Sequence, residues 1–98
     1  MTEERFECVA EVTQDRINRG VRCDPECCPI ALALQEQMPD ATDIDVSAFG
    51  ISLIRNRKHY KSKTSEEAFA FINSFDHNGH PDPTSIPLTF WRVMGYEE

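Results

Sequence analysis

Three of the four cysteines of this 98-residue chain lie within six residues, at Cys23, Cys27 and Cys28. Thiolates and imidazoles are ligands that zinc prefers, so two of these cysteines together with His77 and His80 would make a tetrahedral site. The spacing opposes this hypothesis, because the usual two-residue gap between paired cysteines is absent and the histidines lie about fifty residues downstream. A zinc-stabilised adaptor is therefore an alternative, and the first expectation is a protein with no metal or other cofactor.

Cys28 stands immediately before Pro29, at the predicted start of an apolar helix. The backbone N–H groups and the dipole at such a helix start attract anions and lower the pKa of a thiol. Catalysis would also need a base, and nothing in the sequence brings His59, His77 or His80 to this thiol. A cysteine enzyme is thus the least favoured hypothesis. We interpret Cys28 as a buried or half-buried residue whose helix start is a secondary site for an anion.

Half of the lysines and arginines lie in residues 55–63, although the net charge of the whole chain is −7. The acidic total argues against duplex nucleic acid as a partner, whereas the local concentration of cations favours an anionic partner. The cations would hold phosphate groups, and a tyrosine would stack on a base. The alternative is a solvated hairpin whose charges protect a sheet edge. The predicted binding residues are Arg55, Arg57, Lys58, Tyr60 and Lys61.

Phe90 and Trp91 are adjacent in the last predicted strand, so their side chains face opposite sides of the sheet. Only one of them can lie in the main core. The other is either covered by a second layer or exposed to solvent. An exposed aromatic side chain favours binding of a partner or self-association into a homo-oligomer.

The residues named above must be held by strands and helices, and the strands follow from alternation of apolar and polar residues. The predicted strands cover residues 6–12, 44–48, 51–54, 58–63 and 85–93. We expect the third to continue the second past a bend at Gly50, and Arg55–Arg57 to form the tip of a hairpin. Pro87 lacks a backbone N–H group, which predicts that it stands at the start of an edge strand.

Capping signals and helical periodicity predict three helices, over residues 13–19, 29–38 and 64 to about 76. Thr13 caps the first helix and Gly20 ends it. The sequence Thr64-Ser-Glu-Glu67 has the pattern of a capping box, with its threonine as the capping residue. The helix that follows carries apolar residues on one face at Ala68, Phe71, Ile72 and Phe75.

The element order β-α-α-β-β-β-α-β predicts an α+β fold, with a small, mostly antiparallel sheet and helices packed on one of its faces. We expect a single domain over residues 1–98, with residues 95–98 frayed. The longest apolar run, Pro29–Leu34, is too short to span a membrane, and the chain does not open with a basic segment followed by an apolar one. The expected location is therefore the cytoplasm, where thiols stay reduced.

Four segments that span most of the chain carry a family resemblance: Val12–Gly20, Cys28–Leu34, Phe71–Asp76 and Pro87–Phe90. They are similar to a set of small uncharacterised proteins encoded by bacteriophages and actinobacterial genomes. The motif Cys-Pro-Ile-Ala-Leu-Ala-Leu is the most specific part of this resemblance, while the doubled Cys27-Cys28 and the extended basic hairpin depart from the pattern. The resemblance implies an accessory protein that acts in the cytoplasm of an infected bacterium, and it supplies no catalytic residue.

These observations together predict a non-enzymatic binding protein of phage type. It would sequester or block a host factor as a counter-defence protein. The host factor would be either a protein or an anionic small molecule, such as a phosphate-bearing nucleotide signal. The basic hairpin would carry the binding, with Cys28 as the secondary anion site. Neither duplex nucleic acid nor a membrane is an expected partner.

Overall fold

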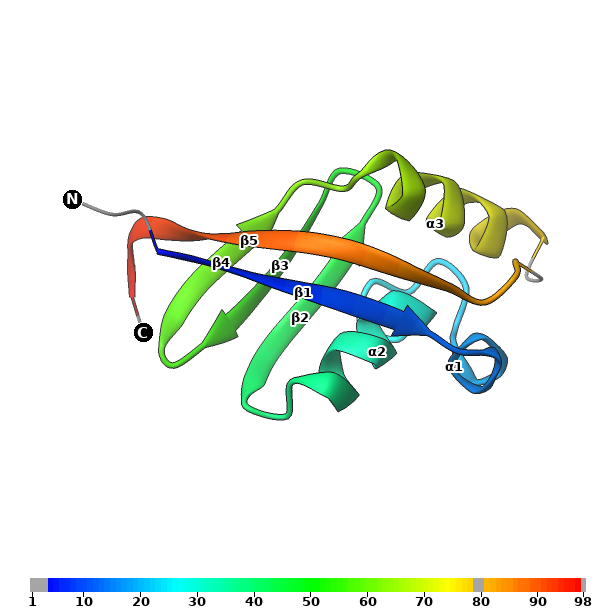
Figure 1. Ribbon diagram of the computed structural model, residues 1–98, viewed down its shortest axis with the longest axis horizontal. Coiled ribbons are helices and arrows are strands. Elements are labelled where there is room, and N and C mark those ends of the chain that lie inside the picture. Colours follow the sequence, from blue (N-terminus) through cyan, green and yellow to red (C-terminus); the bar gives the residue numbers. More distant parts are fainter. Residues whose placement is uncertain (1–3, 79–80, 98) are drawn as a thin grey trace.

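A computed structural model describes residues 4–78 and 81–97 of the chain. Its elements follow the predicted order, which confirms the α+β fold (Figure 1). The strands are β1 (Arg5–Val12), β2 (Ala41–Ser47), β3 (Gly50–Arg55), β4 (Lys58–Ser62) and β5 (Thr84–Glu97). The helices are α1 (Gln14–Arg19), α2 (Pro29–Gln37) and α3 (Glu66–Asn78).

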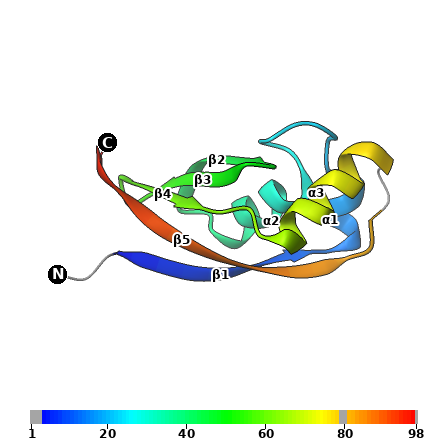
Figure 2. The same cartoon turned by 90° about the horizontal axis from the view of Figure 1, so that it is seen from above.

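The five strands form one sheet in the order β1-β5-β4-β3-β2, and every neighbouring pair is antiparallel. The sheet is strongly curled. Figure 2 shows β1 and β5 on one side of α2, and β2 and β3 on the other. Both edge strands, β1 and β2, contact α2, so the sheet wraps around this helix. We call the face turned away from α2 the outer face.

The core lies between α2 and the concave face of the sheet. Ile30 and Leu34 of α2 are fully buried, as the apolar sequence of this helix predicts. Leu53 of β3 and Phe90 of β5 belong to the same buried cluster. Trp91, next to Phe90, is 41% exposed on the outer face. Of the two aromatic residues, Phe90 is therefore the core residue and Trp91 the exposed one.

The link between β2 and β3 differs from the expected bend at Gly50. The chain reverses in a tight turn at Ala48 and Phe49, and Ser47 pairs with Gly50, so β2 and β3 form an antiparallel hairpin. The hydroxyl of Ser47 accepts a hydrogen bond from the Phe49 N–H at 3.2 Å and donates to the Gly50 carbonyl at 3.0 Å. A serine hydroxyl that bonds the backbone two and three residues on stabilises such a turn.

The helix caps agree with the sequence at α1 and differ by one residue at α3. Thr13 Oγ1 accepts from the Arg16 N–H at 3.2 Å, which confirms the first cap. At α3, Ser65 Oγ accepts from the Ala68 N–H at 3.2 Å, so Ser65 is the capping residue. Thr64 instead donates its hydroxyl to the Ser47 carbonyl at 2.8 Å and ties α3 to β2.

The predicted apolar stripe of α3 is largely confirmed. Ala68, Phe71 and Phe75 are buried, and Ile72 is half-buried against the core cluster. Among the described residues, no helix combines the length and the hydrophobicity that a membrane-spanning helix needs.

The expectation that the last strand, β5, is an edge strand is wrong. In the strand order β5 is interior, between β1 and β4. Pro87 lies opposite Val9 of β1, whereas the β4 pairs of this strand lie between Trp91 and Glu97. The proline thus occupies a stretch with one strand neighbour, where its missing N–H group is tolerated. Glu97, at the end of β5, pairs with Lys58 of β4, and residue 98 lies outside the described part.

Candidate functional site

The predicted hairpin tip is confirmed at Asn56–Arg57, where both residues take positive φ angles, 54° and 63°. The two cations that flank this tip are bound to carboxylates of other segments. Arg55 Nε donates to Asp40 Oδ2 at 2.8 Å, and Lys58 Nζ donates to Glu4 Oε2 at 3.0 Å. The hydrogen bond from Lys58 lowers the pKa of Glu4, and that from Arg55 lowers the pKa of Asp40. Arg55 and Lys58 are therefore already occupied by anions of the chain itself.

Tyr60 belongs to the core rather than to a binding surface. It is buried, and its ring meets the Phe6 ring edge-on, with 4.9 Å between the centroids. Because neighbouring residues of a strand face opposite sides, Lys61 lies on the outer face. The structure thus places the predicted binding residues of the basic hairpin in different environments. Tyr60 cannot stack on a base in the folded protein, Arg57 is exposed at the hairpin tip, and Lys61 is exposed on the outer face.

A row of polar and aromatic residues crosses the outer face. Lys61 of β4 lies opposite Ser52 of β3 on one side and Trp91 of β5 on the other. The row continues to Asp45 of β2, opposite Ser52, and to Arg5 of β1, opposite Trp91. The Arg5 guanidinium lies 5.2 Å from the centroid of the Trp91 ring, a cation–π contact that favours one orientation of the indole.

A groove of about 520 Å³ lies on this face, beside the turn between β2 and β3. Phe49 stands in that turn and is 96% exposed. Lys61 and Lys63 also line the groove, and neither takes part in an ion pair within the described part of the chain. We call this surface the outer-face groove. Its lining includes Phe49, Lys61, Lys63, Trp91, Asp45 and Ser52.

The sequence singles out Lys61 and Trp91 but not Phe49. The reason is the misplaced bend, because a strand that continues past Gly50 leaves residue 49 inside the sheet. A usable signal exists in Ser47-Ala-Phe-Gly50, where a serine and a glycine enclose two residues between alternating stretches. An apolar residue in a two-residue turn projects into solvent and has no core to enter.

Cys28 caps α2 with its own sulfur atom. Sγ accepts from the Ala31 N–H at 3.5 Å, and the residue is 7% exposed. Burial raises the pKa of this thiol to about 11, and the negative charges of Asp76 and Asp24 add to the rise against two backbone hydrogen bonds that oppose it. The thiol is therefore neutral at physiological pH. Its helix start is capped internally in an acidic setting, which does not favour an anion.

All four cysteines are free thiols, and they differ in exposure. Cys23 is exposed and has a positive φ of 58°, whereas Cys8 and Cys27 are half-buried. Within residues 4–78 and 81–97, no three His, Cys, Asp or Glu side chains are grouped so that they could hold a metal ion. His80, one of the proposed zinc ligands, lies outside the described residues.

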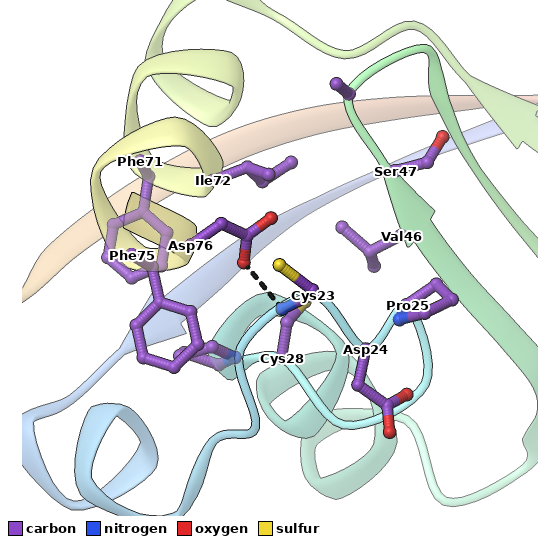
Figure 3. A pocket seen from close by; sticks show the side chains of 12 residues that line it. Cys23, Asp24, Pro25, Cys28, Val46, Ser47, Phe71, Ile72, Phe75 and Asp76 are labelled. Atoms are coloured by element: carbon purple, nitrogen blue, oxygen red, sulfur yellow. Dashed lines mark hydrogen bonds between the residues drawn. The ribbon is translucent and has the colours of Figure 1, made fainter. Parts of the chain in front are cut away.

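A second opening lies between the loop before α2, helix α3 and strand β2 (Figure 3). We call it the cysteine cleft, and its volume is about 280 Å³. The Cys23 N–H donates to Asp76 Oδ1 at 2.9 Å and so ties the loop to α3. The lining includes Cys23, Cys28, Val46, Phe71, Ile72 and Asp76.

The tight approach of Gly20 fixes how the elements around this cleft meet. The N–H of Gly20 donates to the carbonyls of Arg16 and Ile17, which confirms that it ends α1. Its φ of −67° is open to any residue, so the need for glycine is one of space. A Cβ atom here would lie 2.7 Å from the Pro29 ring and 3.1 Å from Phe75 Cζ. The end of α1, the start of α2 and helix α3 therefore meet at this glycine.

No family model, curated protein or solved structure matches this chain. The resemblance to bacteriophage and actinobacterial proteins therefore stays a prediction.

Proposed function

We propose that this protein is a non-enzymatic binding protein whose outer-face groove docks an acidic segment of a partner protein. The observation that carries the proposal is Phe49, 96% exposed on a turn beside two lysines that no carboxylate of the described chain neutralises. Burying a phenylalanine side chain stabilises a complex by roughly 1.5–3 kcal/mol. An aromatic anchor ringed by polar groups is the usual form of an energetic centre in an interface.

The charges of the groove select the partner. Lys61 and Lys63 outnumber Asp45, the one carboxylate among the described lining residues, so this part of the groove is positive within an acidic protein. Carboxylates on the partner would meet these lysines at the rim, where charge pairs govern orientation and association rate more than affinity. Trp91, held by Arg5, offers a second apolar surface to the same segment.

A protein segment fits this groove better than a nucleotide. Planar guanidinium groups make the paired hydrogen bonds that phosphate favours, but Arg55 is bound to Asp40 and lies outside the groove. The lysines that remain are single point charges on flexible stems. Tyr60, the residue expected to stack on a base, is in the core. An exposed Phe49 instead matches an apolar pocket on a protein surface.

The setting of this partner follows from the family resemblance. A small phage-type protein that blocks a host protein needs only a compact docking surface of this kind. The free thiols of all four cysteines agree with a reducing compartment such as the bacterial cytoplasm. We therefore propose that the partner is a cytoplasmic host protein.

Selection from a displayed random peptide library tests this proposal. We expect the peptides enriched on the wild-type protein to combine Asp or Glu with an aromatic or aliphatic residue. The variant Phe49→Ser/Lys61→Ser/Lys63→Ser should bind them at least about tenfold more weakly, the loss that corresponds to 1.4 kcal/mol. Isothermal titration calorimetry measures both affinities.

The matched control uses residues of the same types elsewhere. Phe69 of α3 is 50% exposed, and Arg57 is exposed at the β3–β4 tip. Phe69→Ser/Arg57→Ser should bind the peptides as the wild type does. Enrichment of basic peptides, or equal affinity for the triple variant, would contradict the proposal. So would a nucleotide that binds through Lys61 and Lys63, or a dimer of this protein that the triple variant dissociates.

A further inference from the structure

We infer that the cysteine cleft is a second ligand site, separate from the outer-face groove, and that it takes a small apolar primary amine. Such a ligand has one ring or a short branched chain joined to an ammonium group. The inference does not depend on the proposed function of the groove. It rests on the size of the cleft, its apolar walls and its one inward-facing carboxylate.

The size of the cleft limits the ligand. Pockets that bind small molecules usually measure roughly 300–1,000 Å³. At about 280 Å³ the cysteine cleft is slightly smaller than this range. It fits a single ring with a short chain, and a nucleotide or a peptide is too large for it.

The walls of the cleft are apolar. Val46 of β2 faces Phe71, Ile72 and Phe75 of α3 across the opening (Figure 3). These side chains are buried or half-buried in the folded protein, so a ligand would displace little ordered polar structure. An apolar body is thus the part of the ligand that supplies most of the binding free energy.

Asp76 gives the cleft its charge preference. Its Oδ1 atom accepts from the Cys23 N–H, while its Oδ2 atom has no hydrogen-bond partner within residues 4–78 and 81–97. Figure 3 shows the carboxylate between Ile72 and the Cys23 side chain. Among the described residues that line the cleft there is no lysine or arginine, and the other carboxylate, Asp24, points away from the cleft and accepts from the Glu26 N–H at 2.9 Å.

An ammonium group would complete this arrangement. It can donate to Asp76 Oδ2 in a charge-assisted hydrogen bond, which is about twice as strong as a neutral one. A carboxylate or phosphate would meet uncompensated negative charge. The negative charge of Asp76 also acts on the Cys28 thiol. Burial raises the pKa of this thiol, and Asp76 raises it further.

The cleft is also preformed. The hydrogen bond from Cys23 to Asp76 and the close packing of Gly20 on Pro29 and Phe75 fix its walls relative to one another. A ligand that enters a preformed site spends little binding free energy on ordering the protein.

Alkylation of Cys23 by iodoacetamide reports occupancy, because this exposed thiol lines the cleft. Three probes share one apolar body: 2-phenylethylamine, 2-phenylethanol and 3-phenylpropanoate. We expect the amine to slow alkylation, the alcohol to need at least tenfold higher concentration for the same effect, and the acid to have none. The alkylation rate of free glutathione corrects for any direct effect of a probe.

The variant Asp76→Asn removes the charge and keeps an oxygen that accepts from Cys23. It should reduce the affinity for the amine to that for the alcohol, while Asp82→Asn, at an exposed aspartate outside the cleft, should change nothing. Phe49→Ser/Lys61→Ser/Lys63→Ser should also leave protection intact, which separates this site from the groove. Equal protection by all three probes, or protection by none, would overturn the inference with the wild-type protein alone.

Discussion

The outer-face groove and the cysteine cleft begin at the same turn and have opposite characters. Ser47 lines both, Ala48 lines only the cleft, and Phe49 lines only the groove. The cleft lies between α3, the loop before α2 and β2, and its described lining has the Asp76 carboxylate facing inward and no lysine or arginine, whereas the groove lies on the sheet and carries two lysines. A net charge of −7 therefore says little about either surface. What decides the local charge is which cations have been neutralised by the chain itself.

The largest difference that we expect is in the alkylation rates of the two cysteines that line the cleft, Cys23 and Cys28. Cys23 is exposed, whereas labelling of Cys28 requires the core to open, at a free energy of several kcal/mol. In native protein at pH 7.5 we expect iodoacetamide to modify Cys23 at least ~1,000-fold faster than Cys28. Peptide mass spectrometry resolves the two sites, and after denaturation all four thiols should react. Equal rates at the two cysteines would mean that the start of α2 is not buried.

Truncation of an aromatic residue should destabilise the protein at the wall of the cleft but not at the groove. Phe75 is 3% exposed and Phe49 is 96% exposed. Phe75→Ala should lower the free energy of unfolding by about 3–5 kcal/mol, through lost burial and a cavity. Phe49→Ser should change it by no more than about 0.5 kcal/mol. Urea denaturation measures the free energy of unfolding of both variants. A similar loss of stability in both would show that Phe49 is a structural residue.

The contact of Gly20 with α2 and α3 should be sensitive to a single methyl group. Gly20→Ala places a Cβ 2.7 Å from the Pro29 ring, and overpacking of this kind costs about 1–3 kcal/mol. Gly50 beside the groove is the matched control, because a Cβ there meets only the Ser62 carbonyl oxygen, at 3.5 Å. Gly50→Ala should be neutral or slightly stabilising. Differential scanning calorimetry compares the melting temperatures of the two variants. A lower melting temperature for Gly50→Ala than for Gly20→Ala would disprove the close packing at Gly20.

The acid limb of the stability curve should depend on the ion pairs that join Glu36 of α2 to Arg16 and Arg19 of α1. Hydrogen bonds from Arg19 and then Arg16 lower the pKa of Glu36 from 4.5 to about 2. A carboxyl whose pKa is depressed in the folded state stabilises it above its unfolded pKa, and this contribution is lost as the pH falls toward the folded value. Between pH 4.5 and 2 the stability of Glu36→Gln should therefore fall less steeply than that of the wild type. Parallel curves from urea denaturation at several pH values would contradict this pairing.

The fold could be derived from the sequence because its signals are local. Alternation identified the strands, and Thr13, Gly20 and the α3 stripe identified two of the helices. The misplaced bend at Gly50 involved a turn whose closing hydrogen bonds come from the Ser47 side chain. Nothing in its residue types demanded a left-handed turn conformation, so periodicity alone could not distinguish a bend from a reversal.

The site could be derived only in part because ion pairs join residues far apart in sequence. Glu4 lies 54 residues from Lys58, and Asp40 lies 15 residues from Arg55. Which cations stay exposed therefore depends on the tertiary fold. The sequence could have shown that Tyr60 and Lys61 do not belong to one binding surface, since they are adjacent on a strand and their side chains face opposite sides of the sheet.

A titration of ¹⁵N-labelled protein, followed by ¹H–¹⁵N correlation spectra, tests the central claim most directly. An acidic peptide selected on the wild-type protein should shift the amide signals of residues 47–52, 61–63 and 91. 2-Phenylethylamine should instead shift those of 23–28, 46–48 and 71–76. Peptide-induced shifts confined to the hairpin tip at residues 55–58, or to the walls of the cleft, would contradict the assignment of the outer-face groove as the docking surface.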